Sequence, residues 1–130
     1  MGVDTPGARR MLLVEDEALV AMVTEESLRS LGFDPIVATT ASEALDAVVR
    51  DGPLMFAMVD VGLPDMRGDA LARRLRDCAP SMPIVLASGY DSHELQRGFA
   101  GDDRLRVLTK PYSEHQLRAT LIELALTPAA

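Results

Sequence analysis

Short apolar segments alternate with amphipathic ones along the chain, and this alternation limits the possible folds more than any other feature. The apolar segments span residues 10–14, 35–38, 54–60, 83–88 and 104–110. Segments with helical spacing of apolar residues follow each of them, at residues 17–32, 41–52, 68–80, 92–101 and 114–126. Strands that alternate with helices in this way are typical of an α/β domain.

The predicted strands are apolar nearly from end to end, without polar residues at every second position. Strands of this kind are buried on both faces, which indicates a parallel sheet with helices on each side. We therefore expect a five-stranded parallel sheet with the flavodoxin-like strand order 2-1-3-4-5 and helices on both faces.

The predicted helices differ in the strength of their signals. In the helix at 17–32, an apolar stripe is expected to face the core, and it consists of Leu19, Val20, Val23, Leu28 and Leu31. The helix at 92–101 is interrupted by two glycines, which destabilise a helix interior. We expect it to be the weakest helix of the domain.

Length and composition limit the number of domains, the classes of partner and the cellular compartment that we expect. A chain of 130 residues can bury its own core, so we expect one domain over residues 10–126 with flexible tails at 1–9 and 127–130. No apolar run is long enough to span a bilayer, which predicts no membrane insertion. A formal net charge of -7 and the lack of a basic stripe argue against nucleic acid as a partner. The single cysteine, Cys78, and the lack of a signal peptide favour the cytoplasm.

Polar residues stand at the ends of four predicted strands. Glu15 and Asp16 follow the first strand, Asp60 ends the third, Ser88 ends the fourth and Lys110 ends the fifth. The carboxyl ends of parallel strands meet at one edge of the sheet, and the first and third strands are neighbours in the expected order. We therefore expect Glu15, Asp16 and Asp60 to meet in one crevice.

Three neighbouring carboxylates repel one another unless a cation compensates their charge. Oxygen ligands in an open crevice suit Mg²⁺, or Mn²⁺, because such an ion keeps positions for water or a phosphate oxygen. A carboxylate beside a metal ion, a lysine and a hydroxyl suits the formation of an aspartyl phosphate, since these groups neutralise the phosphoryl oxygens. Asp60 is then the natural acceptor, with Lys110 and Ser88 beside it.

Four blocks of the sequence, LLVEDE, VDVGLPDMRG, LASGY and LTKPY, resemble those of bacterial response-regulator receiver domains in order and approximate spacing. As a set the blocks are specific, and they extend over nearly the whole chain. The resemblance implies an acidic metal pair, a phosphoacceptor, a hydroxyl that follows the phosphoryl group and a phosphate-binding lysine. These are, in that order, Glu15 with Asp16, Asp60, Ser88 and Lys110.

The same resemblance implies further features of the site and its partners. The carbonyl group of Gly62 is expected to complete the metal shell, and the peptide bond between Lys110 and Pro111 is expected to be cis. The phosphoryl donor is expected to be a phosphohistidine on a sensor histidine kinase or a phosphotransfer protein. The domain would signal through protein contacts and assist its own phosphorylation and dephosphorylation, without being an enzyme that turns over external substrates.

Two features depart from the usual pattern of the family. Receivers usually have an aromatic switch residue three positions before the lysine, where this chain has Val107. The LASGY block is similar to the F-A-T-G-x-Y motif of a subgroup of single-domain receivers, with Leu and Ser in place of its Phe and Thr. Because valine is small and stiff at χ1, we expect Tyr90 and residues 91–101 to form the output surface, with Tyr112 as a second candidate.

Other functions are open on the sequence alone. A haloacid-dehalogenase-like phosphatase also forms an aspartyl phosphate, but it needs an aspartate two residues after the nucleophile, where this chain has Gly62. Loss of the acceptor or the lysine would indicate a phosphorylation-independent adaptor, and neither is lost. The terminal receiver of a hybrid histidine kinase is a third alternative, which the short tails disfavour. Taken singly, Asp60 also fits a turn acid and Ser88 a helix cap.

Overall fold

Five parallel strands form the centre of the described part of the chain, which comprises residues 9–89, 91–126 and 128 of this computed structural model. The strands are β1 (Arg10–Val14), β2 (Asp34–Ala38), β3 (Ala57–Asp60), β4 (Ile84–Ser88) and β5 (Leu105–Thr109). They are hydrogen-bonded in the order β2-β1-β3-β4-β5. The predicted fold class and strand order are confirmed.

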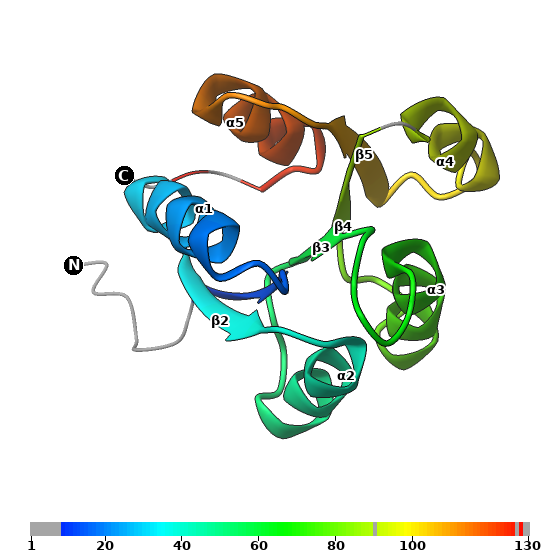
Figure 1. Ribbon diagram of the computed structural model, residues 1–130, viewed down its shortest axis with the longest axis horizontal. Helices are drawn as coiled ribbons and strands as arrows, with labels where there is room; N and C mark the ends of the chain where they lie inside the picture. Colours follow the sequence, from blue (N-terminus) through cyan, green and yellow to red (C-terminus); the bar gives the residue numbers. More distant parts are fainter. Residues whose placement is uncertain (1–8, 90, 127, 129–130) are drawn as a thin grey trace.

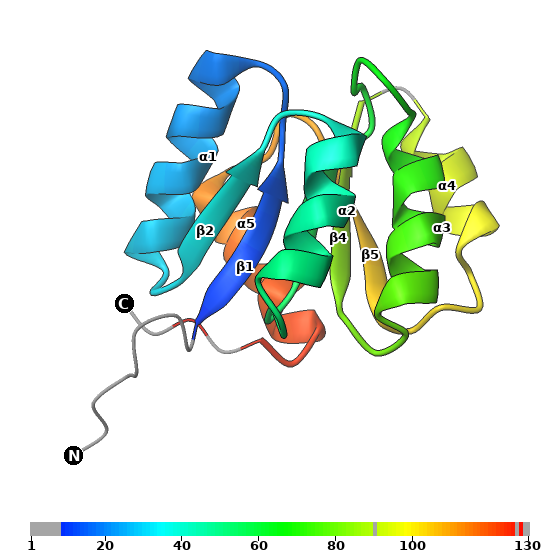
Figure 2. The same cartoon turned by 90° about the horizontal axis from the view of Figure 1, so that it is seen from below.

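Helices cover both faces of this sheet. They are α1 (Ala18–Ser30), α2 (Ala41–Arg50), α3 (Gly68–Cys78), α4 (Ser92–Gly98) and α5 (Glu114–Glu123). Helices α1 and α5 lie on one face, and α2, α3 and α4 lie on the other (Figures 1 and 2). Helix α4 has only 7 residues and ends at its first glycine, so the helix predicted to be weakest is also the shortest.

The two faces of the sheet have separate hydrophobic cores. In β1, Leu12 and Val14 pack with the core beneath α2, α3 and α4, whereas Met11 and Leu13 pack with the core beneath α1 and α5. All four side chains are buried. Because successive side chains of a strand point to opposite faces, a strand between two helical layers has to be apolar throughout.

The face of α1 that packs on the sheet differs in part from the prediction. The side chains that α1 buries are Ala21, Thr24 and Leu28, which are at helical spacing. Leu19 and Val23, which were expected in the core, are 77% and 65% exposed. Leu19 and Val23 instead lie on the flank of α1 that faces α5, where they line a groove.

The tails predicted at 1–9 and 127–130 lie outside the described residues, apart from positions 9 and 128. Arg9 is not loose: its Nε donates to the carbonyl oxygen of Gly32 at 2.7 Å, and its guanidinium carbon lies 4.6 Å from the centre of the Phe33 ring. Within the described residues, no helix combines the length and apolarity needed to cross a membrane.

Candidate phosphoacceptor site

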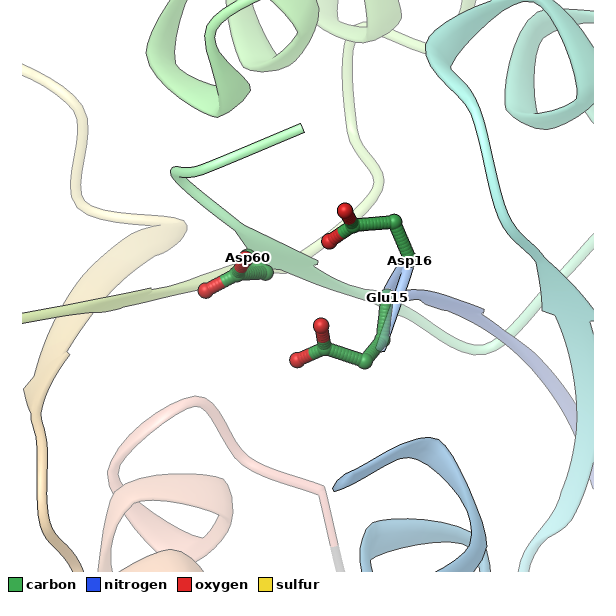
Figure 3. A group of neighbouring side chains, drawn as sticks. All are labelled: Glu15, Asp16 and Asp60. Carbon is green, nitrogen blue, oxygen red and sulfur yellow. The ribbon is translucent and has the colours of Figure 1, made fainter. Parts of the chain in front are cut away.

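Three carboxylates meet at the carboxyl edge of the sheet, as Figure 3 shows. Glu15 and Asp16 follow β1, and Asp60 is the last residue of the neighbouring strand β3. One oxygen atom from each side chain lies within 4.8 Å of the other two. Glu15 and Asp60 are only 5% and 8% exposed, whereas Asp16 faces solvent. The three carboxylates therefore lie together, as the strand ends predict.

The backbone around Asp60 is held tightly in place. Asp60 is in register with Ala87 of β4, and the N–H of Val61 continues the ladder by donating to the carbonyl oxygen of Ala87 at 3.1 Å. Gly68, at the start of α3, approaches so closely that a Cβ there would lie 2.3 Å from the carbonyl oxygen of Asp60. Only glycine fits at this position, which fixes the start of α3 against the carboxyl end of β3.

The surroundings of Glu15 disfavour its charged form. Burial raises the pKa of Glu15 above its ordinary value, and the negative charge of Asp60 raises it further. The backbone N–H of Glu17, which donates to Glu15 Oε2 at 3.1 Å, acts in the opposite direction but does not cancel the rise. A set of carboxylate oxygens with one member open to solvent fits a hard divalent cation such as Mg²⁺.

Lys110 brings a positive charge to the acceptor, because its Nζ donates a hydrogen bond to Asp60 Oδ1. Burial alone would lower the pKa of Lys110, but this hydrogen bond and the charges of Asp60 and Glu15 outweigh burial and raise it. The N–H of Lys110 also donates to the carbonyl oxygen of Ser88 at 2.8 Å, which ties the two strand ends together. The peptide bond between Lys110 and Pro111 is cis, as predicted.

Ser88 lies at the end of β4 and is buried, but its hydroxyl is bonded outside the acidic cluster. It donates to Oδ1 of Asp91, whose other oxygen, Oδ2, accepts from Nη2 of Arg67 at 2.7 Å. The hydrogen bonds from Ser88 and Arg67 hold the pKa of the Asp91 carboxyl below its usual range. Neither Arg67 nor Asp91 was predicted to contact Ser88, although Asp91 begins the segment 91–101 that was predicted as the output surface. The only signal in the sequence is a serine followed three residues later by an aspartate, a spacing at which the two side chains can share a turn.

The remaining predicted residues differ in their relation to the cluster. Gly62 lies beside the acceptor, since a Cβ on it would be 3.5 Å from Asp60 Oδ2. Tyr112 packs partly buried against the core beneath α1 and α5, and burial raises its pKa. Val107 packs against the opposite core, beneath α4. Tyr90 lies outside the described residues, so its role stays a prediction.

A groove of about 960 Å³ opens beside the site, between α1 and the beginning of α5. Apolar side chains that include Leu19, Val23, Tyr112 and Leu117 line it, and Lys110 contributes to the same lining. The groove and the acidic cluster therefore share Lys110, which contacts Asp60.

The fold and the site can be compared with those of known families. The sequence profile of the response regulator receiver domain matches residues 11–122. This chain belongs to the response regulator receiver domain family. The resemblance of its four sequence blocks to receivers is thereby confirmed, while membership of the F-A-T-G-x-Y subgroup stays a prediction.

Relatives of this receiver include both kinases and regulators. The sensor kinase CckA of Brucella abortus (strain 2308) is 34% identical over 122 residues, which make up 93% of this chain and 13% of CckA. The cell cycle transcriptional regulator CtrA of Caulobacter vibrioides (strain NA1000 / CB15N) is 32% identical over 116 residues, or 86% of this chain and 48% of CtrA. The receiver therefore spans less than half the length of either relative.

Solved receiver structures share the fold. A CheY-like response regulator receiver domain protein from Methanospirillum hungatei JF-1 superposes with a TM-score of 0.76 at 27% identity, over 88% of this chain and 91% of that one. A response regulator receiver protein from Sinorhizobium medicae WSM419 superposes with a TM-score of 0.81 at 26% identity, over 92% of this chain and 96% of that one.

Proposed function

We propose that this receiver accepts a phosphoryl group on Asp60 from a phosphohistidine and transmits the signal through protein contacts. The observation that carries this proposal is the contact between Lys110 Nζ and Asp60 Oδ1 at the edge of the acidic cluster. A buried carboxylate that already holds a lysine ammonium group can take on further negative charge without leaving it uncompensated.

Each residue of the site has a defined task in the transfer. An oxygen of the Asp60 carboxylate attacks phosphorus, so that a P–O bond forms while the P–N bond to the donor's histidine breaks. The released ring nitrogen keeps the electron pair and takes a proton from solvent. Lys110 stabilises the negative charge that the phosphoryl group adds, and we assign the Ser88 hydroxyl as a further donor to one of its oxygens. A water oxygen later attacks phosphorus, the P–O bond to Asp60 breaks, and inorganic phosphate leaves. This step returns Asp60 to its free carboxylate and is the dephosphorylation that the domain assists.

We assign Glu15, Asp16, Asp60 and the carbonyl group of Gly62 as the residues that hold Mg²⁺ or Mn²⁺. The clustered carboxylate oxygens and the raised pKa of Glu15 support this assignment, as does the position of Gly62 beside Asp60 Oδ2. A bound divalent cation supplies charge neutralisation at the phosphoryl oxygens.

The groove between α1 and α5 is the surface that we assign to the phosphoryl donor, a sensor histidine kinase or a phosphotransfer protein. A donor has to bring its phosphohistidine to Asp60, so it must contact the surface that borders the acceptor. The groove meets this condition because Lys110 belongs to both. Its exposed Leu19 and Val23 suit an apolar helix face on the donor.

The remaining assignments rest on the sequence and on the family. We take residues 10–126 as the receiver unit and place it in the cytoplasm. We assign Tyr90 and residues 91–101 as the output surface, with Tyr112 as the second candidate. A specific observation also favours a receiver that belongs to a longer kinase. The chain is similar to CckA and to the sensor protein TorS of Escherichia coli (strain K12), and it covers 13% and 9% of their lengths.

The substitution Asp60→Asn tests the proposed function. Asparagine keeps the side-chain volume and removes the nucleophile, so we expect the variant to fold and to take up no phosphate from acetyl phosphate with Mg²⁺, whereas the unchanged protein is labelled. The exposed Asp77 of α3 provides the matched control, and Asp77→Asn should be labelled normally. Hydroxylamine-sensitive phosphate on Asp60→Asn would contradict the assignment.

A further inference from the structure

The hydroxyl of Ser88 has one proton to donate, and in this structure it donates that proton to Oδ1 of Asp91. Ser88 is buried at the end of β4. It is in register with Thr109, the last residue of β5, which directly precedes Lys110. A phosphoryl group on Asp60 would present anionic oxygens that need donors. The same proton cannot serve Asp91 and a phosphoryl oxygen at once.

Asp91 is held in position from a second side. Its Oδ2 accepts from Nη2 of Arg67 at 2.7 Å, and Nε of Arg67 donates to Oδ1 of Asp69 at 3.0 Å. Asp91 occupies the N-cap position of α4, yet its side chain makes no capping hydrogen bond there. Both of its oxygens are instead committed to Ser88 and Arg67.

We propose that Asp91 is a positioning residue that competes with the phosphoryl group for the Ser88 hydroxyl and so favours the unphosphorylated state. This inference rests on the proposed role of Asp60 as the acceptor. Loading of Asp60 breaks the hydrogen bond between Ser88 and Asp91, while the ion pair between Asp91 and Arg67 can persist. The state of the acceptor is thereby transmitted to the segment that begins α4.

This competition supplies a switch that needs no aromatic side chain on β5. Val107 packs partly buried against the core and has no polar atom with which to report the state of the site. The bond that changes instead joins the end of β4 to the start of α4 and, through Arg67, to the N-cap position of α3. Two helices next to the acceptor are therefore linked to one hydroxyl.

Binding of beryllofluoride with Mg²⁺, followed by fluorine NMR, tests the proposal because this phosphoryl mimic needs the Ser88 hydroxyl without any transfer step. Asp91→Ala removes the competing acceptor, so we expect the mimic to bind about tenfold more tightly than to the unchanged protein. Asp91→Asn keeps the volume and a weaker, uncharged acceptor, and its affinity should fall between the two. Asp77→Ala, which removes an exposed carboxylate of α3 that contacts neither Arg67 nor Asp91, is the matched control and should leave the affinity unchanged.

A double-mutant cycle with Ser88→Ala separates positioning from a general effect on folding. Without the hydroxyl there is nothing to compete for, so Asp91→Ala should no longer change the affinity in the Ser88→Ala background. Equal affinities of the unchanged protein and Asp91→Ala, or the same gain in both backgrounds, would overturn the inference. If the unchanged protein does not bind the mimic, or if Asp60→Asn binds it equally well, the proposed function itself is wrong and the inference falls with it.

Discussion

The acidic cluster has two different sides. Toward α1 and α5 it borders an open groove with apolar walls, whereas toward α3 and α4 it borders polar side chains that are hydrogen-bonded to one another. The groove side exposes Leu19 and Val23. On the other side Ser88, Asp91 and Arg67 form a continuous chain of hydrogen bonds. Both sides reach the same centre, the first through Lys110 and the second through Ser88.

This difference separates two tasks that a receiver has to perform with one acceptor. Exposed apolar side chains gain free energy when a partner covers them, which suits recognition of a donor. A chain of charge-assisted hydrogen bonds has two discrete arrangements, bonded and released, which suits a report of the state of the acceptor. Substitutions on the groove side should therefore affect the arrival of the phosphoryl group, and those on the charged side should affect its retention.

The largest effect that should distinguish the two sides is a loss of phosphotransfer on substitution of groove residues. Replacing both Leu19 and Val23 by Asp puts charge where the donor packs, and we expect kcat/KM for transfer from a phosphorylated kinase to fall by more than about thirtyfold. Labelling from acetyl phosphate should not change, because that donor is too small to need the groove. Val49, an exposed valine of α2 on the opposite face of the sheet, offers the control Val49→Asp, which should transfer normally. Equal losses with both donors would show that the groove affects the acceptor itself.

A smaller effect is expected at the acidic cluster that lies between the two sides. Asp16→Ala removes the solvent-facing carboxylate of the cluster, and we expect the affinity for Mg²⁺ to fall by about tenfold or more in calorimetric titration. Mg²⁺ should also raise the Tm of the unchanged protein by mass action, and raise that of the variant less. Asp46→Ala, at an exposed position of α2, controls for the loss of one negative charge. An unchanged affinity in Asp16→Ala would remove this residue from the proposed metal site.

The layered fold could be predicted from the sequence because it depends on burial. Strands covered on both faces must be apolar throughout, and β1 is an example. The glycines after residue 97 predicted a weak helix, and α4 ends at the first of them. The buried face of α1 was predicted only in part, because Leu28 of the expected stripe is buried whereas Leu19 and Val23 are exposed. Tertiary packing turned the smaller Ala21 and Thr24 toward the sheet beside Leu28.

The candidate site could be predicted only in part. The carboxylates and Lys110 stand at strand ends, and the strand order brings strand ends together. Arg67 and Asp91 lie in loops, and which partner a loop side chain chooses depends on geometry that has no periodicity in the sequence. An arginine and an aspartate in a charged chain have many possible partners, so their connection to Ser88 became visible only in three dimensions.

The smallest effect expected on the charged side is its response to pH. The hydrogen bonds from Ser88 and Arg67 hold the pKa of Asp91 below 3.8, the ordinary value of an aspartate. A carboxylate with a lowered folded pKa stabilises the fold above its unfolded pKa, and this contribution is lost as the pH falls through the folded pKa. Asp91 should therefore stay charged between about pH 6 and about pH 8, and the ratio of beryllofluoride affinities between Asp91→Ala and the unchanged protein should be constant over that interval. Measuring both in a His93→Gln background removes the histidine that lies two residues after Asp91 as a source of drift. A ratio that still varies with pH would mean that a group other than the Asp91 carboxylate competes for the Ser88 hydroxyl. A different residue on the α3–α4 side would then have to distinguish that side from the groove.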